Sequence, residues 1–113
     1  MKLTKKEFEE IVYQKFNKLP KRILKKLENI EIFVEDKPPS SNILGIYHGV
    51  PFPYRKSSGY SLIMPDKIIL FKNPIEQQCI NKKKIEEKIE KVLFHEVGHY
   101  LGLGEKSLRK LKL

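Results

Sequence analysis

Apolar side chains recur with a helical period near the start of the chain. Within residues 4–17 they fall three and four positions apart, with Lys and Glu between them: Phe8, Ile11, Val12 and Phe16. Thr4 and Glu7 have the spacing of a capping box, in which each side chain accepts a hydrogen bond from the backbone amide of the other residue. We therefore expect a helix over residues 4–17. Pro20 suits the first turn of a second, shorter helix over residues 21–27, which would bury Ile23, Leu24 and Leu27.

The middle of the chain has the patterns of strands and turns. Residues 30–35 alternate apolar and charged side chains and predict a strand, and residues 43–47 predict a shorter one. Residues 49–59 are rich in Gly, Pro and Ser and indicate a surface loop. The apolar runs 60–64 and 67–71 flank Pro65-Asp66 and suggest a hairpin, and Pro74 ends its second strand.

The longest periodic segment is residues 81–101, which predict a helix with one apolar stripe: Ile85, Ile89, Val92, Leu93, Val97 and Tyr100. A length of 113 residues allows one compact hydrophobic core. We therefore expect an α+β fold in one domain that spans residues 1–113.

Composition narrows the classes of protein that remain. The chain carries 23 Lys and Arg against 14 Asp and Glu, a formal charge of +9, and 20 of the 23 basic residues are Lys. Such a skew, with no Ala in the chain, indicates a compositional bias as much as a function. No apolar run approaches the ~20 residues of a membrane span, and no secretory signal follows Met1, so we expect a cytoplasmic protein. Cys79 is the single cysteine, which excludes a Cys-based zinc cluster and favours a small apolar role.

The predicted last helix contains the sequence H-E-x-x-H from His95 to His99. Side chains four residues apart lie one above the other on a helix, so the two imidazoles can bind one zinc ion. Glu96 lies about 100° round the helix and is not expected to bind that ion, but it can reach a water on it. Zinc lowers the pKa of such a water to about 7, and Glu96 can take its proton and pass it to a leaving amine.

A catalytic zinc usually has three protein ligands, so a third is sought after His99. Gly102 can end the helix in a left-handed conformation, and Glu105 then follows closely enough to turn toward the metal. Glu105 can equally be an acidic residue at the start of a short last helix. His48 can bind metal or substrate, or be a solvated loop residue.

These features together resemble the small bacterial zincin-like metallopeptidases. The resemblance covers about residues 40–109 and rests on residues 44–51, 65–71 and 95–105, of which the last segment is the specific one. It implies a zincin-like α+β fold, with a small mixed sheet packed on a backing helix and an active-site helix. It also implies zinc held by His95 and His99, with Glu96 as the base. The eleventh position of the motif, usually Asp in that family, is Glu105 here.

The sequence thus favours a zinc metallopeptidase that hydrolyses peptide bonds, with zinc on His95, His99 and Glu105. An extended peptide substrate would add to an exposed edge strand in the 43–47 or 60–64 region. Tyr47, Tyr54 or Tyr60 could hold the oxyanion, and the sequence does not choose among them.

Two alternatives to an enzyme stay open. Zinc could be purely structural, fixing the helix to the tail with His48 or Cys79 as a fourth ligand. The excess of Lys could bind nucleic acid or an acidic partner, although no aromatic side chains alternate with it. We interpret residues 82–91 as the solvated face of the long helix, where Lys alternates with Glu, and we expect no membrane partner.

Overall fold

The computed structural model describes residues 1–27, 30–40, 43–49 and 66–102. In chain order its elements are α1 (Lys5–Asn17), α2 (Lys21–Leu24), β1 (Ile30–Glu35), β2 (Gly45–His48), β3 (Asp66–Phe71), α3 (Lys72–Gln77) and α4 (Lys82–Tyr100). The predicted α+β class is confirmed.

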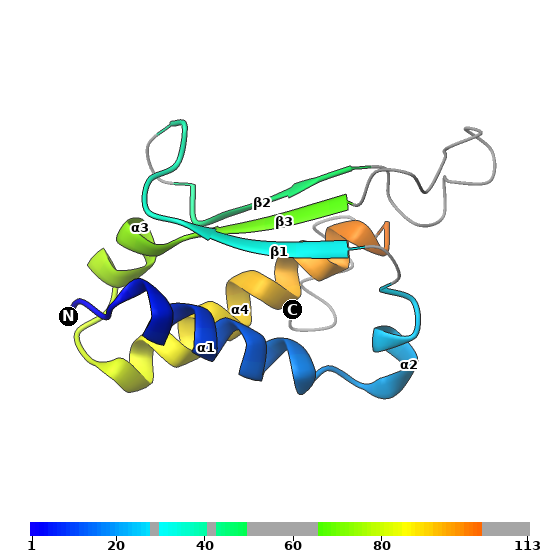
Figure 1. Ribbon diagram of the computed structural model, residues 1–113, viewed down its shortest axis with the longest axis horizontal. Coiled ribbons are helices and arrows are strands. Elements are labelled where there is room, and N and C mark those ends of the chain that lie inside the picture. The colour runs from blue at the N-terminus through cyan, green and yellow to red at the C-terminus, as the bar shows by residue number, and fades with distance from the viewer. Residues whose placement is uncertain (28–29, 41–42, 50–65, 103–113) are drawn as a thin grey trace.

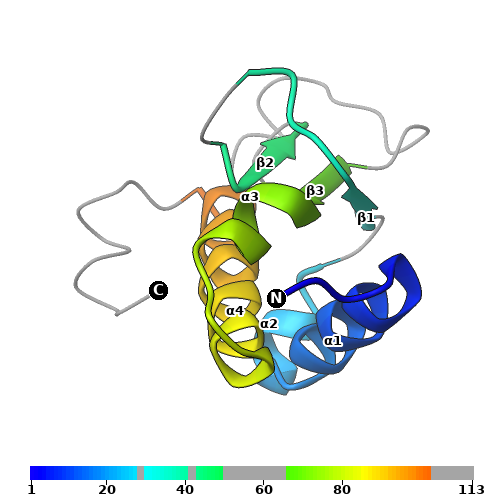
Figure 2. The same cartoon turned by 90° about the vertical axis from the view of Figure 1, so that its left-hand side faces the viewer.

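The described elements form two layers (Figures 1 and 2). The sheet lies on one side, and α1 and α4 run side by side on the other. The strand order is β1-β3-β2. The central strand β3 pairs in parallel with β1 and antiparallel with β2. Helix α4 contacts both β2 and β3, so its last turns lie beneath that side of the sheet.

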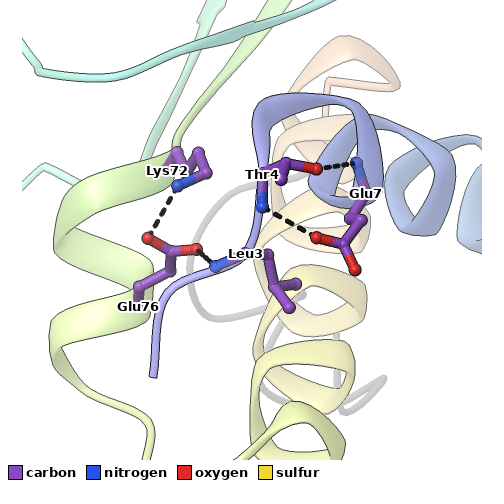
Figure 3. A network of polar contacts seen from close by, with 5 residues as sticks. All are labelled: Leu3, Thr4, Glu7, Lys72 and Glu76. Carbon is purple, nitrogen blue, oxygen red and sulfur yellow. Dashed lines mark hydrogen bonds and ion pairs between the residues drawn. The ribbon is translucent and has the colours of Figure 1, made fainter.

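Helix α1 begins as its sequence predicts. The backbone amide of Glu7 donates to the hydroxyl of Thr4 at 3.1 Å, and the amide of Thr4 donates to the carboxylate of Glu7 at 3.0 Å (Figure 3). This capping box gives partners to two amides that a helix start leaves unpaired. The predicted inner face is buried at Phe8, Ile11 and Val12, and Phe16 is partly buried.

Helix α2 is shorter than predicted, because it ends at Leu24 instead of residue 27. The hydroxyl of Tyr100 donates to the carbonyl of Lys26 at 2.9 Å. That carbonyl is therefore turned toward α4 and is not part of a continuing helix. Leu27 is buried all the same, and Ile23 and Leu24 are partly buried against the core.

Strand β1 has the predicted bounds. Strand β2 was predicted over residues 43–47, but it begins two residues later and ends one residue later. Strand β3 begins at Asp66, which the sequence pattern assigned to a turn. The other half of the predicted hairpin, residues 60–64, and most of the predicted 49–59 loop lie outside the described residues. Among the described strands, β3 pairs with β1 and β2.

Helix α3 was not predicted. Strand β3 does end before Pro74, but the chain goes directly into a six-residue helix that contains this proline. Pro74 is the third residue of α3, in the first turn, where a backbone amide has no partner within the helix. A proline that ends a strand can therefore also begin a helix.

The core lies between the sheet and the two long helices. Every position of the predicted apolar stripe on α4 is buried, and Cys79 is a buried free thiol among apolar neighbours, as expected. Among the described residues, no helix is long and apolar enough to cross a membrane.

Candidate metal centre

Helix α4 carries the candidate ligands in its last two turns. It begins at an N-cap, Asn81, whose side chain accepts a hydrogen bond from the amide of Lys84 at 2.9 Å. It ends where Gly102 adopts the left-handed conformation, with φ of +81°. The predicted left-handed residue is confirmed, and it follows the second histidine by three residues, where it ends the helix.

His95, Glu96 and His99 converge at this end of the helix. One ligand atom from each lies within 4.8 Å of the others. The two imidazole rings are 4.7 Å apart between centroids and are inclined at 82° to each other. Two nitrogens that share a tetrahedral zinc at about 2.0–2.1 Å would be roughly 3.4 Å apart. Since the ligand atoms lie within 4.8 Å of one another, the donor set can hold a zinc ion.

Glu96 differs from the two histidines in its surroundings. Its side chain is buried, at 8% exposure, whereas both histidines are half-buried. A Cβ placed on Gly45 would lie 3.4 Å from Cγ of Glu96, so β2 packs directly against the Glu96 side chain. The packing holds Glu96 next to the histidines.

Of the other candidate site residues, His48 and Tyr47 lie in the described part of the chain. His48 is exposed and is the last residue of β2, not part of a loop. The hydroxyl of Tyr47 donates to the buried carboxylate of Asp66 at 2.6 Å, so that proton is not available to an oxyanion. Glu105, Tyr54 and Tyr60 lie outside the described residues, as does the short last helix suggested after Gly104.

A groove of about 290 Å³ adjoins the convergent group. Residues 43–45 line one side, and the face of α4 that carries Lys88, Lys91, Val92, His95 and Glu96 lines the other. We call it the α4–β2 groove. Within the described part of the sheet, β2 pairs only with β3, so its other edge has no further described strand beside it.

Sequence reasoning missed three features of this site: the buried carboxylate of Asp66, the close approach at Gly45, and the position of Lys88 and Lys91 on the groove. An isolated Gly in a predicted strand is a signal of close backbone approach and could have identified Gly45. The two lysines were interpreted as part of a solvated face. Their position depends on which side of α4 meets β2, and the hydrophobic pattern does not specify that.

Comparison with known proteins agrees with this architecture. A sequence model of the family described as "zincin-like metallopeptidase" matches residues 27–113. No curated protein matches the chain significantly. Among solved structures, the chain is similar to a conserved hypothetical protein from Thermus thermophilus, with a TM-score of 0.56 and 20% sequence identity. That alignment covers 96% of this chain and 99% of the other, and at this identity it supports the fold. With its H-E-x-x-H residues gathered at one end of α4, the chain belongs to the zincin-like metallopeptidase family.

Proposed function

We propose that this protein is a zinc-dependent peptidase. The observation that carries the proposal is the convergence of His95, Glu96 and His99 within 4.8 Å beside an open groove. In this proposal His95 and His99 bind the metal, and Glu105 is the third protein ligand. When bound, zinc supplies a Lewis acid that acidifies a water molecule and stabilises negative charge on a carbonyl oxygen.

The protein's own residues would transfer the proton and align the substrate. The carboxylate of Glu96 accepts a proton from the attacking water and returns it to the nitrogen of the leaving amine. Its burial under β2 favours this role, because the packing fixes the carboxylate in one position beside the histidines. The edge of β2 can align an extended peptide along the α4–β2 groove by backbone hydrogen bonds.

The first test separates metal binding from proton transfer. Protein purified without added metal should contain zinc by elemental analysis, and it should cleave a mixed peptide library in a chelator-sensitive way. Glu96→Gln should keep its zinc, because the amide replaces a group that does not bind the metal. It should lose hydrolysis by at least about a hundredfold, the usual contribution of a positioned base.

Glu86→Gln is the matched control. It makes the same change on the same helix, ten residues before Glu96 and therefore about 15 Å along the axis. It should keep both zinc and activity. Equal turnover by Glu96→Gln and the parent would reject the assignment of the base, and zinc-loaded protein that cleaves no library member would reject the peptidase.

The role of Glu105 is tested by metal retention. Glu105→Ala should lose zinc faster than the parent during dialysis against a mild chelator, because only two histidine ligands remain. Glu105→Asp should retain zinc nearly as well, since it preserves an oxygen ligand one methylene shorter. If both variants retain zinc like the parent, Glu105 has the helix-capping role that its sequence position also allows.

A further inference from the structure

The α4–β2 groove combines apolar walls with two cationic side chains. Lys88, Lys91 and His95 are spaced i, i+3 and i+7 on α4 and therefore share one helical face. Ile43 and Leu44 lie opposite them. Along the helix axis, Lys91 is about 6 Å and Lys88 about 10 Å from His95.

Neither lysine is neutralised by a neighbouring carboxylate among the described residues. Glu87 forms its ion pair with Lys84 at 3.5 Å, and Glu90 forms one with Lys15 of α1 at 3.1 Å. No ion pair joins Lys88 or Lys91 to another described residue. Glu87 and Glu90 thus form ion pairs with other lysines, and the wall of the groove on α4 has a net positive charge.

Lys88 and Lys91 also lie beside a second hollow. It has a volume of about 420 Å³, is lined further by the ion pair of Lys84 with Glu87, and reaches Cys79 and the exposed Ile80. A ligand that extends from the metal centre along α4 would therefore pass both lysines in turn.

From this arrangement we propose that Lys88 and Lys91 determine specificity, so that the groove selects peptides with acidic side chains near the scissile bond. The inference rests on the proposed peptidase function and adds its substrate class. An extended chain advances about 3.3 Å per residue. Acidic side chains about two and three residues from the carbonyl at the metal centre would therefore lie beside Lys91 and Lys88.

An acidic peptide fits the groove better than a nucleic acid does. Three of the eight residues that line the groove are aliphatic, namely Ile43, Leu44 and Val92, and they suit aliphatic side chains of a peptide. Among the described residues that line it, none is Phe, Tyr or Trp, and the imidazole of His95 is assigned to the metal in the proposed function. From the described lining, the phosphate backbone would meet only two lysines, whereas nucleic-acid sites use more cations.

Binding can be measured apart from hydrolysis with zinc-loaded Glu96→Gln, which should not cleave the probe. The probes are fluorescein-labelled ten-residue peptides with an adjacent Glu pair, and the same peptides with Gln-Gln or Lys-Lys. Moving the pair along the peptide determines its distance from the metal centre. The Glu peptides should bind about two- to thirtyfold more tightly than the Gln peptides, the range for two exposed ion pairs. The Lys peptides should bind most weakly.

The variant Lys88→Glu/Lys91→Glu should lose this preference or invert it, and the milder Lys88→Gln/Lys91→Gln should abolish it. Melting curves establish that each variant is folded. Lys5→Glu/Lys6→Glu is the matched control, because it changes the net charge equally on exposed positions of α1. It should keep the preference.

Three results would overturn the inference: equal binding of Glu and Gln peptides by the parent groove, an equal loss in the α1 control, or tighter binding of an oligothymidine that depends on Lys88 and Lys91. The last result would assign the groove to nucleic acid.

The outcomes for function and specificity are distinct. Zinc-dependent cleavage without Glu preference would reject only the specificity, and Glu-selective binding without cleavage would reject only the peptidase.

Discussion

Gly45 shows how closely β2 approaches the face of α4 that carries the histidines. A Cβ at this position would lie 2.8 Å from Cγ1 of Val92, closer than carbon atoms pack, and 3.3 Å from the carbonyl oxygen of Ile69. The same Cβ would be 3.4 Å from Cγ of Glu96. An added methyl group therefore requires the Val92 side chain or the backbone of β2 to shift beside the proposed base, so we expect Gly45 to be a positioning residue for Glu96.

Gly45→Ala should accordingly lower kcat about ten- to hundredfold while zinc content stays unchanged, because displacements near 1 Å are costly at a reacting group. The measurement is kcat and KM for the best library peptide, together with the pH profile of kcat. A shifted profile would indicate an altered environment of Glu96, which a general loss of stability would not produce. Ile46→Ala, in the next position of β2, is the control for loss of packing. Unchanged kcat in Gly45→Ala would show that Glu96 does not depend on this contact.

Gly49 is a second position where the backbone itself is constrained. Its φ is +155°, and a Cβ there would overlap the carboxyl group of Asp66. Asp66 is almost completely buried and accepts the hydroxyl hydrogen bond of Tyr47. The ring of Tyr47 in turn packs edge-on against Tyr100, with centroids 5.9 Å apart. The start of β3, the end of β2 and the end of α4 are thus joined by one polar and aromatic cluster.

At the level of elements, the capping box of α1 makes a prediction about pH. The backbone amide and the hydroxyl of Thr4 lower the pKa of Glu7 below its usual 4.5, since both contacts favour the charged carboxylate. A carboxyl whose pKa is lower in the folded state stabilises the fold above its unfolded pKa. That contribution is lost as the pH falls through the folded value.

Glu7→Gln should therefore be less stable than the parent at pH 7, and the difference should shrink as the pH falls below about 4.5. Urea unfolding at several pH values between 7 and 3 measures it. Glu10→Gln, an exposed carboxylate of the same helix outside the capping box, should show little pH-dependent difference. A constant difference between parent and Glu7→Gln over the whole range would contradict the role of ionised Glu7.

The helices show which elements a sequence can predict. Helices α1 and α4 were predicted within one residue at each end, because a cap and a regular apolar stripe both mark them. Helix α3 was missed, since six residues are too few for a period. The pairing of β1 with β3 was also missed, because turn signals such as Pro65-Asp66 are local, whereas this parallel pair joins Ile30 to Asp66 across the intervening β2.

The proximity of the three candidate site residues on α4 was predictable to the same degree and for the same reason. His95, Glu96 and His99 lie within one helical turn, so their spacing determines their proximity. The groove beside them depends on the contact of α4 with β2, two elements far apart in the chain. Local spacing therefore predicts the chemistry of the centre, and tertiary packing determines the surroundings that a substrate would meet.

On the scale of the whole molecule, Glu76 connects the start of the chain to helix α3, which directly follows β3. Its carboxylate accepts hydrogen bonds from the backbone amide of Leu3 at 2.7 Å and from the ammonium of Lys72 at 2.9 Å (Figure 3). The side chains of Lys72 and Glu76 are only 10% and 4% exposed. Removing one charge of such a pair leaves the other buried without compensation, which costs more than the pair contributes.

Glu76→Gln should therefore lower the free energy of unfolding by about 3 kcal/mol, because the ammonium of Lys72 stays buried beside a neutral amide. Lys72→Met/Glu76→Gln should be more stable than Glu76→Gln alone, since the buried charge is gone and the Gln carbonyl can still accept the amide of Leu3. Urea unfolding of the four proteins of this cycle measures the coupling. The exposed pair of Lys84 and Glu87 provides the comparison, and Glu87→Gln should cost less than about 1 kcal/mol. If the double variant is no more stable than Glu76→Gln, the ion pair with Lys72 does not stabilise the buried carboxylate. The hydrogen bond from the amide of Leu3 would then be the contact that stabilises it.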